Sequence, residues 1–302
     1  MDQVAQAYES LIEHFVTWAV KEAAITSALV IGSRARTDHP ADEWADLDVI
    51  VVTKDPERLL AHTDWLAEIG KPALTFVEDT SSGGEKERRV LFENGLDVDF
   101  SVIPYEKIQM MLMPEVFQQA AGELSNIFGR GVRVLLDKEG QVDRLGELVG
   151  HYQAPQVRPP QEADFLQVVH DFWYHALWTA RHLRRGELWW AKGGCDGRLK
   201  SLLFVLLEWH ARATQGPGYD TWFRGRFLEE WADPGAVREL GTVFAHYDAE
   251  DVWRALLATM KLFRWLAMET AERWGLAYPV EGDEFATRLT EELFEARSNL
   301  ES

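Results

Sequence analysis

The chain has 302 residues, of which 46% are hydrophobic, and its formal net charge is −19. This length suits two domains, and the acidity disfavours nucleic acid as a partner, because nucleic-acid binding depends on cationic side chains. A cationic partner is favoured instead, although acidity can also serve solubility alone. The single cysteine, Cys195, excludes an internal disulfide and a thiolate-rich zinc site, and none of the nine histidines forms an HExxH motif.

Neither a targeting signal nor a membrane segment is evident. Residues 1–14 lack the basic-then-apolar pattern of a signal peptide. No apolar stretch approaches the roughly 20 residues that a membrane span needs. We therefore expect a cytoplasmic protein with no membrane partner.

Apolar runs suited to strands alternate with helical patterns in the first half of the chain. They predict strands at 24–31, 47–52, 73–77, 89–92, 96–103 and 132–136. Asn94-Gly95 separates the fourth and fifth runs and predicts a two-residue hairpin turn. Alternation along the fifth strand then places Asp99 and Phe100 on opposite faces. Residues 78–87, EDTSSGGEKE, are predicted to form a mobile loop.

The composition changes at residues 151–161, HYQAPQVRPPQ, a segment with three prolines that we interpret as a linker between domains 1–155 and 156–302. Beyond it, amphipathic segments predict helices at 161–186, 188–213, 220–231, 234–247 and 249–274. The predicted fold is therefore α+β: a mixed sheet with helices, followed by an all-α bundle. Most of the ten tryptophans in the second domain are expected in its core.

The most informative motif is the pair Asp46 and Asp48, which opens the second predicted strand shortly after a Gly-Ser-Arg turn at residues 32–34. A side-chain period of two puts both carboxylates on one strand face, where a divalent cation could bridge them. Asp99 adds a third acid at a similar place on a later strand. Clustered acids repel one another unless a cation is bound. The trio therefore predicts a Mg²⁺ site for phosphoryl or nucleotidyl transfer, often built with two ions about 4 Å apart.

The turn at Gly32, Ser33 and Arg34 suits the same chemistry. Glycine permits a tight turn, exposed amides with the Ser33 hydroxyl can cradle terminal phosphates, and Arg34 can add a charge-assisted contact. A Gly-Ser pair alone is typical of an ordinary strand-to-helix turn, and a lone DxD is typical of a strand's start. Their combination within one short segment, with a third strand-borne acid, favours a function.

Together these motifs resemble the aminoglycoside 6-adenylyltransferases, the streptomycin-modifying branch of the nucleotidyltransferase superfamily. The similarity extends over nearly the whole chain. It is carried by GSR at 32–34, PADEWADLDV at 40–49, DFSVIP at 99–104, VLLDKE at 134–139, Pro160, Phe165, DFW at 171–173, WH at 209–210 and GLAYP at 275–279.

The resemblance implies a polymerase-beta-like nucleotidyltransferase domain and a helical substrate-binding domain. It implies transfer of AMP from the co-substrate ATP to a hydroxyl of a cationic aminoglycoside, which gives antibiotic resistance. Asp46 and Asp48 would bind Mg²⁺. Asp99 would take the proton from the attacking hydroxyl or complete the metal site, and we favour the base.

In the helical domain, acidic and aromatic side chains suit a polycationic sugar. The resemblance implies that Asp171, with Trp173 two residues on, binds the substrate; the alternative is a solvated helix carboxylate beside a core aromatic. Asp196 is a further candidate for the substrate and Lys200 for the triphosphate. The segment GGCDG at 193–197 departs from the family, where a more helical, polar segment is expected, and this leaves the acceptor open.

Two other functions stay open at this point. One is a nucleotidyltransferase that modifies another small molecule or a protein hydroxyl. The other is a catalytically silent module that binds a nucleotide or a drug. The sequence is compatible with a monomer or a small homo-oligomer.

Overall fold

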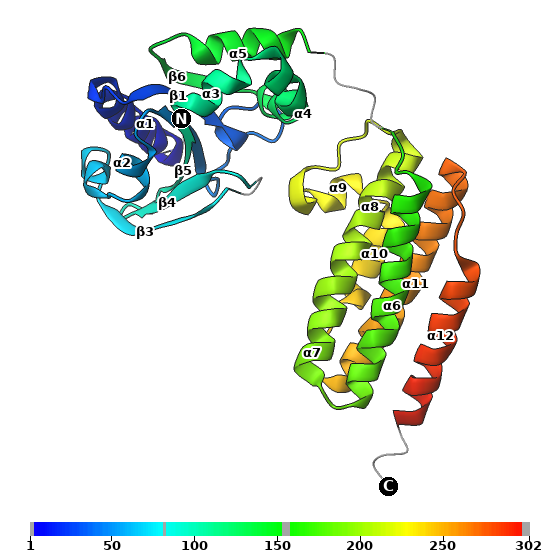
Figure 1. Ribbon diagram of the computed structural model, residues 1–302. Coiled ribbons are helices and arrows are strands. Elements are labelled where there is room, and N and C mark those ends of the chain that lie inside the picture. The colour runs from blue at the N-terminus through cyan, green and yellow to red at the C-terminus, as the bar shows by residue number, and fades with distance from the viewer. Residues whose placement is uncertain (1–2, 81–82, 153–157, 298–302) are drawn as a thin grey trace. The chain divides into compact units, whose positions relative to one another are not determined.

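The computed structural model describes residues 3–80, 83–152 and 158–297 and divides into two compact units, Met1–Ala154 and Pro155–Ser302 (Figure 1). The division falls within the predicted linker, of which residues 153–157 lie outside the described residues. Within the described ranges, no helix combines the length and apolar character that crossing a membrane requires. The predicted fold class is confirmed: a mixed sheet with helices in the first unit, and helices in the second.

The first unit is built on a six-stranded sheet with the order β3-β4-β5-β2-β1-β6. Strands β2 and β5 are parallel, and the other neighbouring pairs are antiparallel. Each predicted strand is present, with bounds shifted by a few residues: β1 Ile25–Ile31, β2 Leu47–Thr53, β3 Pro72–Asp79, β4 Lys86–Phe92, β5 Asp97–Pro104 and β6 Arg133–Asp137.

One face of the sheet carries the core of this unit. Leu47 and Val49 of β2 and Phe100 of β5 are buried there with Phe15 of helix α1 and with Trp65, whose ring meets that of Phe100 edge-on with centroids 5.1 Å apart. Because side chains alternate along a strand, the intervening residues of β2 and β5 face the other side. The helices of the unit are α1 Gln3–Lys21, α2 Pro56–Leu60, α3 Tyr105–Met111, α4 Pro114–Arg130 and α5 Gln141–Gly150.

The hairpin between β4 and β5 has a three-residue loop, so the predicted two-residue turn is wrong by one residue. The backbone N–H of Phe92 donates to the carbonyl of Leu96 at 2.9 Å, which leaves residues 93–95 in the loop. Gly95 has a φ of +83°, and its N–H donates to the carbonyl of Phe92 at 2.9 Å. This is the pattern of a type I turn followed by a left-handed glycine. The extra residue changes which side chains face each other across the strands.

The predicted loop at residues 78–87 is shorter than expected. Glu78 pairs with Glu87 and Asp79 with Lys86, so β3 and β4 continue through most of this polar segment. An ion pair of 2.6 Å joins the Lys86 and Asp79 side chains. Cross-strand pairing therefore overrides the polar composition. Residues 81–82 lie outside the described residues.

The second unit is a bundle in which α11 packs against α6 and α8, and α12 packs against α6 (Figure 1). The predicted segment 188–213 contains a π-helical turn at Gly193–Leu199, and the segment 220–231 forms only a 3-10 turn and a short helix. A final helix was not among the predicted segments. The helices are α6 Glu162–Arg184, α7 Leu188–Lys192, α8 Lys200–Gln215, α9 Leu228–Trp231, α10 Pro234–Val243, α11 Ala249–Trp274 and α12 Val280–Glu295.

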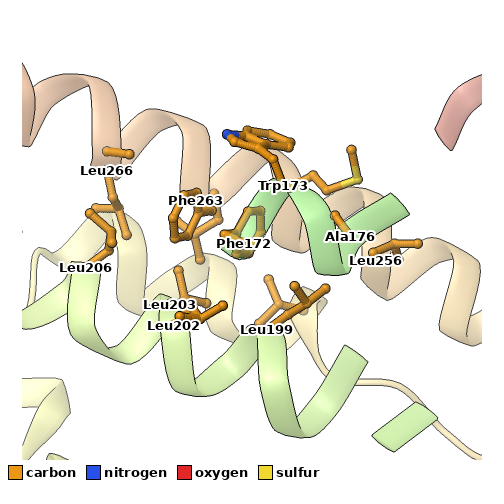
Figure 2. Packing of buried hydrophobic residues seen from close by; sticks show 14 of the residues in the cluster. Phe172, Trp173, Ala176, Leu199, Leu202, Leu203, Leu206, Leu256, Phe263 and Leu266 are labelled. Atoms are coloured by element: carbon orange, nitrogen blue, oxygen red, sulfur yellow. The ribbon is translucent and has the colours of Figure 1, made fainter. Parts of the chain in front are cut away.

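Aromatic and leucine side chains fill the core of the bundle (Figure 2). Phe172 of α6 stacks on Phe263 of α11 with ring centroids 3.6 Å apart, and leucines of α8 pack beneath them. Of the ten tryptophans here, only Trp173, Trp231 and Trp253 are buried, so the expectation of a mostly buried set is wrong. The apolar side chains of Leu, Phe and Ala supply most of this core instead.

Candidate active site

The structure brings together the three acids that the sequence singled out. Asp48 of β2 lies directly opposite Asp99 of the parallel strand β5, and Asp46 immediately precedes β2. One carboxylate oxygen from each lies within 4.8 Å of the others. Asp46 and Asp48 are half-buried and Asp99 is buried. Asp48 and Asp99 lie on the sheet face opposite the core.

This donor set fits a divalent cation. Magnesium holds six oxygens octahedrally at about 2.1 Å, so neighbouring ligands are about 3 Å apart and opposite ones about 4.2 Å, and the carboxylates would move closer together to share one ion. Among the described residues, Oδ1 of Asp99 is buried and has no hydrogen-bond partner. A buried carboxylate oxygen without a partner is costly unless a ligand satisfies it. Asp46, Asp48 and Asp99 are therefore the residues that could hold a cation here.

Gly32 lies against the carboxylate of Asp48. The 3-10 turn Gly32–Arg34 follows β1, and Gly32 has a φ of +70°. A Cβ atom on Gly32 would lie 2.2 Å from Oδ2 of Asp48. Glycine is therefore needed here for two reasons: the backbone is left-handed, and the Asp48 carboxylate leaves no room for a Cβ atom.

Replacing Gly32 by alanine should move the Asp48 carboxylate away from the other acids. We expect Gly32→Ala to weaken Mn²⁺ binding and turnover by at least about tenfold, in line with the energy of one strained position. Mn²⁺ titration by electron paramagnetic resonance measures the first effect. Gly122→Ala in α4 is the matched control, since nothing lies within 4 Å of its added methyl group. Equal behaviour of the two variants would contradict this account of Gly32.

Ser33 and Arg34 differ in their availability to a phosphate. In the described part of the chain, the Ser33 hydroxyl is buried and has no hydrogen-bond partner. The Arg34 guanidinium is engaged: Nε donates to the carbonyl of Asp46 at 2.9 Å and Nη2 to that of Ala45 at 2.6 Å. Its Cζ lies 3.4 Å from the ring centroid of Tyr8. Ser33 therefore has a hydroxyl donor without a partner among the described residues, whereas Arg34 holds the chain that precedes β2.

Arg89 is a charged neighbour of the trio that sequence reasoning missed. It lies opposite Asp99 on β4, and its Nη2 is 3.0 Å from Oδ2 of Asp99. Its Nε is 2.5 Å from a carboxylate oxygen of Glu78 and 3.2 Å from one of Glu87. The correct register of the β4–β5 hairpin would have placed Arg89 opposite Asp99.

Burial raises the pKa of Asp99 to about 7, even though the Arg89 guanidinium acts to lower it. The negative charges of Asp48, Glu87 and Asp46 raise it further. A carboxyl with a pKa near neutrality exchanges protons readily at physiological pH, as a general base requires.

The raised pKa predicts how stability depends on pH in the cation-free protein. The pKa of about 7 in the folded state exceeds the ordinary value of 3.8, so folding favours protonated Asp99. This stabilisation is complete below the ordinary pKa and is lost as pH rises through the folded value. We expect the free energy of unfolding in EDTA to fall by about 2–3 kcal/mol from this group between pH 5 and pH 8. Urea denaturation of wild type and Asp99→Asn isolates the contribution, and identical pH slopes would contradict it.

Two of the predicted residues in the second unit are carboxylates with cationic neighbours. The Asp171 side chain is 14% exposed; it pairs with Arg198, and its Oδ1 lies 2.6 Å from Nδ1 of His175. Asp196, in the π-helical turn, pairs with Lys192. Both acids are thus partly accessible and already neutralised by a neighbour.

Trp173 and Lys200 make their contacts inside the bundle. Trp173 is 3% exposed, and its indole N–H donates to the Tyr278 hydroxyl at 3.2 Å, so it offers no open face to a substrate. Lys200 Nζ donates to the carbonyl of Cys195 at 3.0 Å and to Oγ1 of Thr259 at 2.8 Å. Burial lowers the pKa of Lys200. Its ammonium group satisfies the bundle's own oxygens.

Comparison with known proteins identifies the family. A family model described as Streptomycin adenylyltransferase matches residues 6–293. A Bacillus subtilis protein named aminoglycoside 6-adenylyltransferase is 21% identical over 292 residues, covering 95% of this chain and 97% of the relative. One of the same name from Campylobacter jejuni is 21% identical over 273 residues, covering 88% of each chain.

A crystal structure of an aminoglycoside 6-adenyltransferase from Bacillus subtilis aligns with a TM-score of 0.44 at 19% identity, over 94% of this chain and 97% of that one. The family match extends over nearly all of the sequence. This protein belongs to the Streptomycin adenylyltransferase family.

Proposed function

We propose that this protein transfers AMP from ATP to a hydroxyl group of an aminoglycoside, with Mg²⁺ as the cofactor and streptomycin as the acceptor. The observation that carries the proposal is the acid trio just before β2, on β2 and on β5, in which one carboxylate oxygen from each acid lies within 4.8 Å of the others beside the Gly-Ser turn. The names of its relatives, aminoglycoside 6-adenylyltransferases, support this class of acceptor.

Asp46 and Asp48 hold the cation in this proposal. Bound there, Mg²⁺ would supply charge neutralisation for the triphosphate and a template for in-line displacement. The turn at Gly32 contributes backbone amides to the phosphates, and the buried Ser33 hydroxyl, which has no partner among the residues described, donates to a phosphate oxygen.

Asp99 acts as the general base. The acceptor hydroxyl oxygen forms a bond to the α-phosphorus of ATP while the bond from that phosphorus to the β-phosphate oxygen breaks. The hydroxyl proton passes to the Asp99 carboxylate, and pyrophosphate leaves with the bonding electrons. A hydroxyl group is a poor acid, so activation by the cation and a carboxylate within about 3 Å would have to act together.

The second unit binds the aminoglycoside in this proposal. The charge of −19 for the chain favours a cationic ligand, and Asp171 offers a carboxylate to an ammonium or guanidinium group. That group would replace Arg198 or His175 as the partner of Asp171.

We expect Asp171→Ala to raise the KM for streptomycin by about tenfold with a smaller effect on kcat, because it removes a contact made equally in the ground state and the transition state. Steady-state kinetics at saturating MgATP measure it. Asp164→Asn, an exposed acid on the same helix, is the control and should leave KM unchanged. An unchanged KM in Asp171→Ala would remove Asp171 from the substrate site.

Mass spectrometry of streptomycin incubated with the protein, ATP and Mg²⁺ tests the function. We expect a product heavier by one AMP group, formed together with pyrophosphate and absent with EDTA. A product from another aminoglycoside only would reject streptomycin and keep the reaction. Binding of MgATP without pyrophosphate release across a broad aminoglycoside panel would reject the enzyme and favour a silent binding module.

A further inference from the structure

We propose that Tyr8 and Arg34 form a brace that positions Asp46, so that Arg34 supports cation binding and does not bind the nucleotide. Here Arg34 is a positioning residue, because it acts through the backbone that carries the acid. The inference rests on the proposed function, since it takes Asp46 as a ligand of the cation.

The first half of the brace joins Arg34 to the segment that carries Asp46. The guanidinium donates to two successive carbonyls, those of Ala45 and Asp46, at 2.6 and 2.9 Å. Hydrogen bonds from a charged donor are about twice as strong as neutral ones, and the planar fork fixes direction as well as distance. Asp46 lies outside the regular pairing of β2, so these two bonds set the direction in which the chain enters the strand.

Tyr8 is the second half. It is a residue of α1 that is 4% exposed, and the Arg34 guanidinium lies on its ring, with Cζ 3.4 Å from the centroid. Its hydroxyl accepts a hydrogen bond from the backbone N–H of Asp97 at 3.1 Å. Asp97 begins β5, two residues before Asp99. One buried side chain therefore connects the segment that carries Asp46 to the strand that carries Asp99.

The three acids differ in how firmly the sheet holds them, and this difference indicates what the brace does. Asp48 and Asp99 lie on paired strands, so the sheet fixes their separation. Asp46 has no such support and is half-buried among like charges. Repulsion from the other two acids favours any movement of Asp46 away from them. The brace opposes that movement before a cation binds, as outer residues commonly do for metal ligands.

Two titrations separate a brace from a phosphate contact. The first measures Mn²⁺ affinity without nucleotide by electron paramagnetic resonance, and the second measures ATP affinity in EDTA by calorimetry. Arg34→Lys keeps the positive charge but loses the planar guanidinium group that donates to two carbonyls. Tyr8→Leu removes the aromatic ring on which that group lies. We expect both variants to weaken Mn²⁺ binding about 10- to 100-fold and to leave ATP affinity in EDTA unchanged. Tyr8→Phe keeps the stacked ring but loses the hydrogen bond to Asp97, so its Mn²⁺ affinity should lie between those of wild type and Tyr8→Leu.

Normal Mn²⁺ affinity in Arg34→Lys would overturn the brace. The brace would also be overturned if Arg34→Gln lost ATP affinity in EDTA but kept its Mn²⁺ affinity. Wild type that fails to bind Mn²⁺ would overturn the metal site of the proposed function together with the brace. Circular dichroism checks folding. If Tyr8→Leu does not fold, the half-buried Arg34 variants and Tyr8→Phe decide the question.

Discussion

Asp48→Asn is expected to lower the turnover number roughly a thousandfold or more. The loss is large because a metal ligand contributes several kcal/mol to the stabilisation of transition-state charge. The amide has almost the shape of the carboxylate, so the sheet and the neighbouring Gly32 are undisturbed. Its neutral oxygen is a much weaker ligand for a hard cation. Pyrophosphate release with ATP, Mg²⁺ and streptomycin measures the rate.

The control for this variant is Glu43→Gln, which removes an exposed charge from the segment just before the acid pair. It should change the rate by less than about twofold, since exposed charges are strongly screened. Unchanged turnover in Asp48→Asn would remove Asp48 from the metal site. An equal loss of turnover in both variants would mean that the overall negative potential of this segment sets the rate and that Asp48 is not a specific metal ligand.

Asp99→Asn carries the second large effect. Loss of a general base should lower kcat by about 10²–10⁴, while Mn²⁺ affinity should fall much less than in Asp48→Asn. The comparison is needed because a lost ligand can lower the rate by as much as a lost base. A rate loss below about tenfold would reject the base. A fall in Mn²⁺ affinity as large as that in Asp48→Asn would make Asp99 the third ligand. Glu106→Gln, an exposed acid shortly after β5, is the control.

The face on which the acids lie was predictable from the sequence. Alternation in LDVIVVT and DVDFSVIP places Leu47, Val49 and Phe100 in the core and sends Asp48 and Asp99 to the other face, as the structure has them. A buried strand admits few registers, because a slip of one residue would expose its whole apolar set. The parallel pairing of β2 with β5, which sets Asp48 beside Asp99, depends on contacts between distant segments and is not encoded in either strand alone.

Arg89 shows how an error of one residue in a turn hides a charged neighbour of Asp99. A two-residue loop at Asn94-Gly95 would place Val90 opposite Asp99. The three-residue loop places Arg89 there, with its guanidinium 3.0 Å from the carboxylate. Both loops are compatible with an Asn-Gly pair, so local sequence preference does not choose between them.

The contacts of Trp173 and Lys200 could not be predicted from the sequence, because they depend on how the helices pack. Phe172 and Trp173 are adjacent, yet both are buried, and the rings of both contact Phe263 of α11. Lys200 finds its acceptors at Cys195 on the π-helical turn and at Thr259 on α11. A partner 59 residues away is a property of the packed bundle and has no local signature.

Diffraction from crystals soaked with Mn²⁺ and a non-hydrolysable ATP analogue, with data collected at the manganese absorption edge, tests the central claim most directly. We expect an anomalous peak bonded to carboxylate oxygens of Asp46 and Asp48 and to a phosphate oxygen of the analogue, with the Asp99 carboxyl adjacent. An analogue bound with no anomalous peak between Asp46 and Asp48, or with the peak at other residues, would contradict the claim that these acids form the metal centre.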